Sequence, residues 1–282
     1  MLNLGLKFIS VDEKLIRMIL ETGSSNINEI VILPAVKMVM KKIVKKLQNK
    51  IIHGRVHNGI LNGVKVSVIR SQIGCPNMAM VKECLKRSKA KIVIRLDFCG
   101  GIGNEQNIAI GDVLIPNVAF CDDGTSPQYI RNYPSLLNQL DSIENPLSLT
   151  QNLATGNQTI FMAKPNNELK DIIMKEAHDQ GKSVKDAKLW TIDALFCETF
   201  DFVKSLRTIG IQAIDMESSI LFLLGQLYNL KTVSILSVSD LPQHPKYDMM
   251  NSNEIHPNME KGIEDAIKLV TLALPKIQSI KN

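Results

Sequence analysis

Short apolar runs rich in Val and Ile alternate with longer amphipathic stretches along most of this chain. The runs have the length of buried strands, and the stretches between them have helical periodicity. The alternation predicts an α/β fold with a largely buried, partly parallel sheet. The expected strands are Ile30–Leu33, Val64–Arg70, Lys91–Leu96, Asp112–Phe120, Val184–Ile192, Ile211–Asp215 and Thr232–Val238, and the expected helices are Val36–Lys50, Pro76–Ser88, Asn167–Gln180, Thr199–Thr208, Glu217–Tyr228 and Asn258–Ala273.

The chain has 282 residues, which is enough for one large core and short enough for one domain spanning residues 1–282. We find no internal repeat and no low-complexity linker. The stretch Asp122–Pro165 is rich in Asn, Pro, Ser and Gln, and it is expected to form long loops with little regular structure.

Composition narrows the class of protein. No apolar run reaches the roughly 18–20 residues of a membrane helix, and Met1–Ser10 lack the features of a signal peptide, so a cytoplasmic protein is expected. The five cysteines are an odd number without a Cys-x-x-Cys pair, which argues against a disulfide framework or a zinc site. We therefore expect no metal and no cofactor.

Much of the basic charge falls on one face of the expected helix Val36–Lys50, within a chain of net charge +5. RNA or an acidic membrane would suit such a face, but a solvated helix surface is the commoner cause. We therefore expect neither nucleic acid nor membrane as a partner, and the lack of aromatic residues between the lysines argues further against single-stranded nucleic acid.

The carboxyl ends of the expected strands are the places to look for a ligand site. Arg95 lies in an apolar strand and needs an anionic partner, either a ligand or the nearby Asp97 on the same face. The glycine-rich run Cys99–Gly103 follows, and a tight turn is its simplest explanation.

Two further strand ends carry carboxylates. Asp215 suits the N-cap of the helix that follows, whereas Glu217 begins an almost wholly apolar helix and needs a donor such as a sugar hydroxyl. Asp240 closes another buried strand, where it either acts on a ligand or forms a turn before Leu241-Pro242.

Taken in order, these segments resemble the purine and uridine nucleoside phosphorylases. The best match runs from Trp190 to Pro242 and includes the segment Thr191–Thr199, then Asp-Met-Glu-Ser at Asp215–Ser218 and Val-Ser-Asp at Val238–Asp240. Further similar segments are Asn3–Leu6, Ser71–Pro76 (with Gly74), Cys99–Gly101, Gly111–Val113 and Asp123–Ser126.

The resemblance implies a three-layer α/β/α sandwich with a central mixed sheet. It also implies cleavage of a nucleoside by phosphate into free base and ribose 1-phosphate. Members are usually homo-oligomers, dimers or hexamers, with sites at subunit interfaces. A site of this kind needs a cationic phosphate cradle, a carboxylate on the sugar hydroxyls and an acid at the departing base.

The nucleoside part of the family pattern is present. By resemblance Glu217 binds the ribose hydroxyls, Met216 packs on the sugar and Asp240 protonates the leaving base. Base stacking falls to Leu195 or Phe196. A Gln and an Arg that uridine-cleaving relatives often carry near Thr199 and Asp201 are missing, which favours a purine.

The phosphate part departs from the pattern, although Arg95 is kept. The departures are Ala35 and Val39 in place of a glycine and an arginine, Asp97 and Phe98 in place of a glycine and a hydroxyl residue, Ile52 in place of a neighbouring subunit's arginine, and Asn3 in place of a histidine. Each lost charge-assisted contact is worth on the order of 1.5–3 kcal/mol.

Three functions remain compatible with this pattern. The first, which we favour, is a phosphorylase with a rearranged phosphate site using Arg95, Arg55 and Lys37. The second is a nucleoside-binding or assembly subunit that completes a hetero-oligomer with an active paralogue. The third is a nucleosidase in which water replaces phosphate.

Overall fold

Eleven strands form one mixed sheet in the computed structural model, which describes residues 9–103, 108–149 and 157–280. Most of its central strands are runs of β-branched residues buried on both faces, as expected for strands covered by helices. The strands are β1 Ile30–Leu33, β2 Gln48–His53, β3 Val56–Leu61, β4 Val64–Ile69, β5 Ile92–Gly101, β6 Val113–Cys121, β7 Asp141–Glu144, β8 Thr159–Ala163, β9 Val184–Thr191, β10 Ala213–Asp215 and β11 Lys231–Asp240.

The sheet follows the order β2-β3-β4-β1-β5-β10-β9-β6-β8-β7, and β11 pairs with both β5 and β6. Because β11 bridges these two strands, β5, β11, β6, β9 and β10 close into a ring. β1 lies parallel to β4 and β5, and β5 lies parallel to β11, so the carboxyl ends of β1, β5 and β11 point the same way. The expected α/β fold with a mixed sheet is confirmed.

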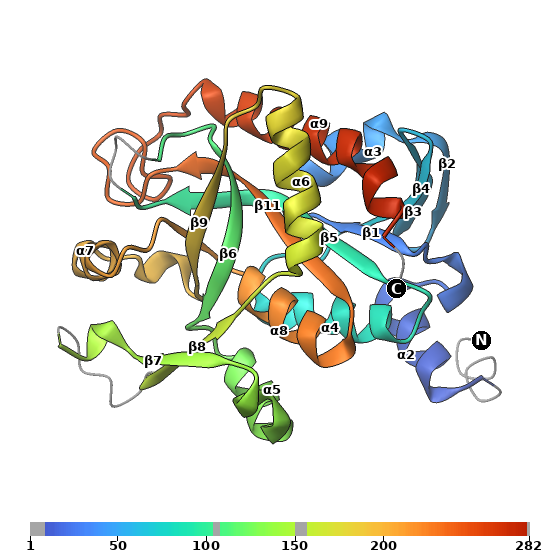
Figure 1. The fold of residues 1–282 in the computed structure, drawn as a ribbon, viewed down its shortest axis with the longest axis horizontal. Helices are drawn as coiled ribbons and strands as arrows, with labels where there is room; N and C mark the ends of the chain where they lie inside the picture. Colours follow the sequence, from blue (N-terminus) through green and yellow to red (C-terminus); the bar gives the residue numbers. More distant parts are fainter. Residues whose placement is uncertain (1–8, 104–107, 150–156, 281–282) are drawn as a thin grey trace.

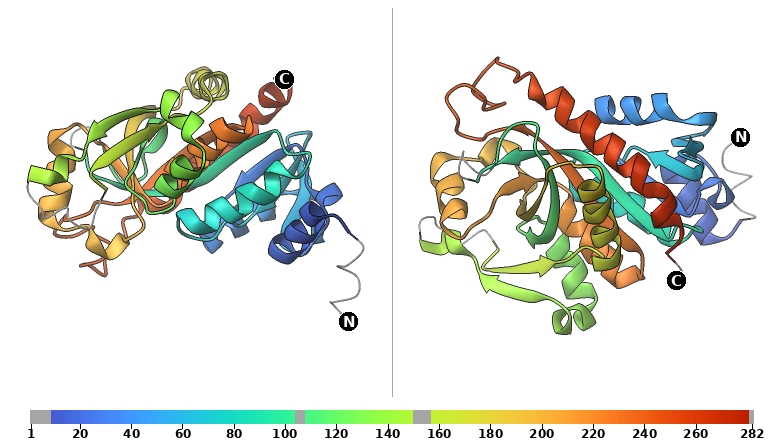
Figure 2. Two further views of the ribbon diagram at one scale, coloured as in Figure 1. Left: turned by 90° about the horizontal axis from the view of Figure 1, so that it is seen from below. Right: turned by 45° about the horizontal axis from the view of Figure 1, so that its top comes forward.

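Helices cover both faces of the strands (Figures 1 and 2). One hydrophobic core joins the strands to α2 (Val11–Leu20), α4 (Cys75–Lys86), α5 (Ser126–Asn132) and α8 (Ser218–Tyr228). A second core joins them to α3 (Lys37–Lys46), α6 (Asn167–Asp179) and α9 (Asn258–Gln278), and α7 (Phe200–Thr208) packs on a third. Helix, sheet and helix therefore form three layers.

Two expectations about local structure were wrong. The first basic helix ends at Lys46, and the chain then enters the β2–β3 hairpin. β2 was missed because its residues are mostly exposed and show no apolar alternation, so pairing with β3 determines its conformation. The stretch Asp122–Pro165 contains α5, β7 and β8 where long loops were expected, because β8 pairs with β6 and β7 pairs with β8.

The glycine-rich run is also different from the expected turn. β5 continues through Gly100 and Gly101, which pair with β10 and β11. A Cβ on Gly101 would lie 2.8 Å from side-chain atoms of both Ile108 and Val238. These glycines are therefore needed for close strand packing rather than for a turn. Within the described part of the chain, no helix combines the length and apolar character needed to span a bilayer.

Candidate functional site

A cavity of about 200 Å³ lies where the carboxyl ends of β1, β5, β10 and β11 converge. Two groups of residues form its walls. The β1–β5 side consists of Ala35, Val36, Arg95, Asp97 and Phe98, and the β10–β11 side consists of Leu195, Glu198, Met216, Glu217, Ser239 and Asp240. The ends of strands in an α/β sheet are where ligands are expected to bind.

Arg95 is the one cationic residue among the described residues that line this cavity, and it is 2% exposed. Its Nη2 donates to Glu217 Oε2, and its Nη1 lies 3.1 Å from Asp215 Oδ2. Burial by itself would lower the pKa of Arg95, but Glu217, Asp215 and Asp97 raise it above its ordinary value. Arg95 is thus a permanently charged group held between carboxylates.

Asp97, the carboxylate that the sequence offered as a partner of Arg95, does not form an ion pair with it. The paired carboxylates are Asp215 and Glu217, whereas Asp97 binds backbone amides instead. The Nε and Nη1 atoms of Arg95 have no hydrogen-bond acceptor among the described residues. Nη1 therefore makes an ion pair with Asp215 without hydrogen-bond geometry, and both nitrogens remain as donors for a ligand or water.

Glu217 is held in place from two sides. Its Oε1 accepts a 2.8 Å hydrogen bond from the amide of Gly74, and its Oε2 accepts from Arg95. Gly74 has a φ of 99°, a conformation that side-chain-bearing residues rarely adopt, which aims its amide at the carboxylate. Burial raises the pKa of Glu217 to about 7, although Arg95 opposes this shift.

Asp215 was expected as the N-cap of α8, but the N-cap residue is Glu217, and Asp215 binds the helix start from two positions earlier. Its Oδ2 accepts from the amide of Ser218, the first residue of α8, and its Oδ1 accepts from the Thr191 hydroxyl at 2.7 Å. The carboxylate therefore fixes the start of α8 and, with it, the position of Glu217.

Asp97 is 1% exposed and accepts three hydrogen bonds from backbone amides. Its Oδ2 accepts from Ala35 and from Val36, the latter at 3.1 Å, and its Oδ1 accepts from Phe98 at 2.9 Å. Burial raises the pKa of Asp97, while Arg95 and the three amides act in the opposite direction. The carboxylate thus fills the space in front of the β1–α3 loop.

Asp240 forms the far wall of the cavity with Glu198. The Ser239 hydroxyl donates to Asp240 Oδ1 at 2.6 Å. Burial raises the pKa of Asp240 to about 6. Burial, together with the charges of Asp240 and Asp248, raises the pKa of Glu198 to about 8. Glu198 is therefore protonated near neutral pH, and Asp240 becomes protonated below about pH 6, so that this wall can donate hydrogen bonds or a proton.

The structure brings together most of the residues that the sequence selected. Arg95, Leu195, Met216, Glu217 and Asp240 all line the cavity, and the backbone amide of Gly74 donates a hydrogen bond to Glu217. Phe196 does not line it, because its side chain points away and is 83% exposed. Leu195 is therefore the apolar residue of that pair available to a ligand.

Four lining residues were missed by the sequence analysis: Ile73, Glu198, Ser239 and Met249. Glu198 and Ser239 lie inside the segments that carry the resemblance, so a signal for them was available. Met249 comes from the irregular chain between β11 and α9, where no periodic pattern indicates which residue faces inward.

The residues proposed to rebuild a phosphate site lie elsewhere. Arg55 donates to the carbonyls of Ile19 and Arg70, and Lys37 is exposed at the start of α3. Neither lines the cavity. Val39 is fully buried in the core under α3, and Ile52 is 53% exposed on β2. Asn3 lies outside the described residues.

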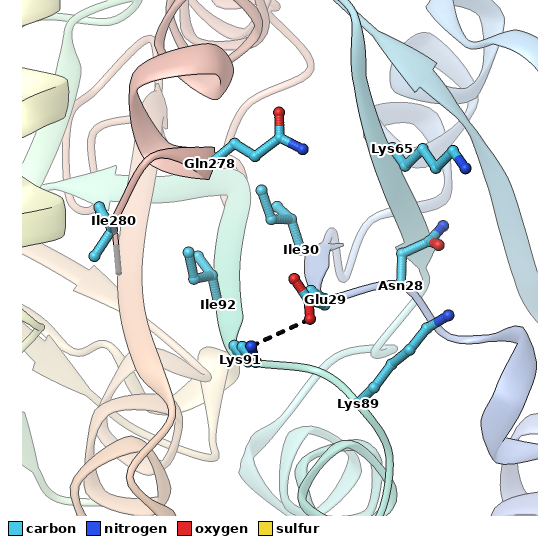
Figure 3. Close-up of a pocket in the computed structure, with 9 residues that line it drawn as sticks. All are labelled: Asn28, Glu29, Ile30, Lys65, Lys89, Lys91, Ile92, Gln278 and Ile280. Carbon is cyan, nitrogen blue, oxygen red and sulfur yellow. Dashed lines mark ion pairs between the residues drawn. The ribbon is translucent and has the colours of Figure 1, made fainter. Parts of the chain in front are cut away.

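A larger hollow of about 530 Å³ lies at the opposite end of the strands (Figure 3). It is formed by residues at the amino-terminal ends of β1, β4 and β5 and the end of α9. Lys91 pairs with Glu29 at 3.2 Å, and Lys65 and Lys89 are exposed to solvent. None of the residues that line this larger hollow is a buried polar residue, so we place the candidate site in the smaller cavity.

The described part of the chain contains no cluster of three or more His, Cys, Asp or Glu side chains arranged to hold a metal ion. The buried carboxylates of the cavity are instead satisfied by Arg95, by hydroxyls and by backbone amides.

A family model described as the phosphorylase superfamily matches residues 29–275. Because this match covers most of the chain and includes every residue of the cavity, the chain belongs to the phosphorylase superfamily.

Relatives and solved structures agree with this assignment. The chain is 27% identical over 177 residues to a DeoD-type purine nucleoside phosphorylase of Brevibacillus brevis, and 26% identical over 181 residues to one of Bacillus cereus. The alignments cover 62% of this chain and 63% of each relative.

Among solved structures, uridine phosphorylase of Vibrio fischeri superimposes with a TM-score of 0.69 at 22% identity, covering 89% of this chain and 94% of that one. Purine nucleoside phosphorylase of Toxoplasma gondii, in complex with immucillin-H, superimposes with a TM-score of 0.67 at 17% sequence identity. That match covers 89% of this chain and 92% of the other. These likenesses show the fold.

Proposed function

We propose that this chain binds a purine nucleoside in the cavity and cleaves its N-glycosidic bond. The observation that carries the proposal is that two carboxyl groups line one cavity. Glu217 is held in place by the Gly74 amide, and Asp240 has a pKa raised to about 6. The two groups suit opposite ends of a nucleoside, the sugar hydroxyls and the base.

Each side chain has one chemical task in this proposal. Glu217 accepts hydrogen bonds from the ribose hydroxyls, and Met216 packs on the sugar. Leu195 contacts the base. Asp240 in its protonated form donates to the departing base, so that the bond between C1′ and the base nitrogen breaks with the electron pair leaving on a neutral purine.

The acceptor of the ribosyl group is the second part of the proposal. The DeoD-type relatives are named as phosphorylases, which supports phosphate as the acceptor. The cavity itself favours an acceptor without charge, because its one guanidinium already faces three carboxylates. A nucleoside-binding subunit without turnover is the remaining candidate, favoured by the same shortage of positive charge.

The test is to assay purified protein with inosine, adenosine and uridine, each with and without phosphate, for release of free base. We expect base from a purine nucleoside and none from uridine. Nucleoside binding without base release would assign the binding-subunit role, and cleavage of uridine alone would overturn the purine assignment.

We also propose that the protein assembles into an oligomer, with copies of itself or with a paralogue, in the cytoplasm as part of purine salvage. Two large apolar residues that line the cavity are exposed, Ile73 (51%) and Met249 (55%), and two more are exposed in the segment that follows Leu195, Phe196 (83%) and Phe200 (60%). Such a group of exposed apolar residues is typical of an interface. Sedimentation analysis should show a dimer or larger species, and Phe200→Glu should weaken it; a wholly monomeric protein would contradict this.

A further inference from the structure

The amides of Ala35 and Val36 form an anion-binding position at the start of α3. Val36 is the N-cap of this ten-residue helix, and its own side chain makes no capping hydrogen bond. Free amides at a helix start, at the positive end of the helix dipole, attract anions. Both amides face the cavity wall, and both already have the same partner, the Oδ2 atom of Asp97.

The carboxylate of Asp97 takes the place of an anion at these two amides. Asp97 is 1% exposed and lies two residues from Arg95 along β5. Its carboxylate oxygens accept hydrogen bonds from backbone amides rather than from a neighbouring cation. An oxyanion bound here from solution would use the same two amides. Asp97 and a second anion therefore compete for one position.

The charges of the cavity also disfavour a second anion. Arg95 faces Asp215, Glu217 and Asp97, and no other Lys or Arg lines the cavity among the described residues. A further guanidinium, that of Arg70, donates through its Nε to the Ala35 carbonyl at 2.9 Å. A phosphate of one to two negative charges would enter a low-dielectric site that already has more carboxylates than cations.

We infer that Asp97 is an internal anion that permanently occupies the acceptor position, so that this protein uses the nucleoside with water and takes no phosphate. The inference rests on the proposed function, because it concerns the acceptor in the same cavity. The unused Nε and Nη1 donors of Arg95 suit a neutral oxygen such as that of water.

The reaction is then balanced as a hydrolysis. The bond between C1′ and the base nitrogen breaks, and the base leaves with the electron pair and takes the proton of Asp240. The oxygen of water bonds to C1′ and releases a proton, which restores protonated Asp240. The products are free base and ribose.

The experiment measures binding of inorganic phosphate and of nucleoside separately, by calorimetry, in the natural protein and in two variants. Asp97→Gly vacates the position and frees the two amides. Asp97→Asn is the matched control, since it removes the charge but keeps a side chain of the same size in place. Thermal unfolding of all three proteins checks that each is folded.

We expect phosphate affinity weaker than about 10 mM for the natural protein. Asp97→Gly should bind phosphate at least about tenfold more tightly, the effect of one regained contact, whereas Asp97→Asn should gain much less. Base release by the natural protein should yield ribose at a rate independent of phosphate.

Submillimolar phosphate affinity in the natural protein, ribose 1-phosphate as its product, or equal gains in the two variants would each overturn the inference. Nucleoside affinity is measured in the same samples. If the natural protein binds no nucleoside, the proposed function is overturned instead. The failure of the inference and the failure of the proposed function are therefore distinguishable.

Discussion

The two sides of the cavity differ in what their charged groups are free to do. On the β10–β11 side, Asp240 accepts hydrogen bonds from the Ser239 hydroxyl and the Met249 backbone amide, and its carboxyl group lines the cavity. On the β1–β5 side, Asp97 is fully engaged by three amides, and Arg95 is surrounded by carboxylates. Asp240 is therefore placed to act on a ligand, whereas Asp97 already has its hydrogen-bond partners within the protein.

In the inference made above, one side chain, Asp97, decides which acceptor the site takes. A carboxylate at Asp97 provides the hydrogen bonds that a bound anion would otherwise supply to the loop before α3. The loop therefore needs no ligand to be stable. Asp240, in contrast, lies at the end of β11, where its carboxyl group lines the cavity.

The largest effect that would test this contrast is expected from Asp240→Asn. The variant removes the proton donor and keeps the size of the side chain, so base release should fall by about 100-fold or more. Nucleoside affinity serves as the control and should change little. Base release at the natural rate would show that the β10–β11 side does not contain the acid.

A smaller effect is expected from Glu217→Gln. A charged acceptor of the ribose hydroxyls is lost, so nucleoside affinity measured by calorimetry should fall by about tenfold or more. Glu217→Ala should in addition destabilise the protein, because Arg95 and the Gly74 amide lose a buried partner. Unchanged nucleoside affinity in Glu217→Gln would leave this carboxylate with a structural role only.

The pH dependence of kcat/KM should distinguish the two carboxyl groups. Asp240 must be protonated, which its raised pKa allows below about 6, and Glu217 must be ionised, which requires a pH above about 7. Far from these values the rate should fall by about tenfold per pH unit on each side. The profile should therefore be bell-shaped with its maximum between these two pKa values.

The variants assign the two limbs of this profile. Asp240→Asn should remove the fall at high pH, and Glu217→Gln should remove the fall at low pH. A profile that keeps both limbs in both variants would mean that other groups titrate.

The smallest effects should come from the two adjacent apolar residues at the cavity mouth. Leu195→Ala removes part of the apolar wall, and nucleoside affinity should fall by roughly 5-fold to 30-fold. Phe196→Ala should change it by less than about twofold, because this exposed side chain does not line the cavity. The reverse order of effects would show that Phe196 turns inward when ligand binds.

The sequence by itself determined the α/β class, because runs of buried β-branched residues alternating with amphipathic helices have few other solutions. It also selected the strand ends that meet at the cavity, since polar residues such as Arg95 and Asp240 stand out in apolar strands. Edge strand β2 and the short elements between Asp122 and Pro165 escaped prediction, because pairing rather than local pattern decides them.

The tertiary structure alone decided which charged groups are partners. Asp97 and Arg95 are near neighbours on β5, and the sequence left either Asp97 or a ligand as the partner of Arg95. In the structure, Arg95 pairs with residues more than a hundred positions away, and Asp97 binds the loop after β1. Parallel pairing of β1 with β5 brings that loop beside Asp97. Such contacts depend on how strands are ordered in the sheet, and no local pattern encodes that order.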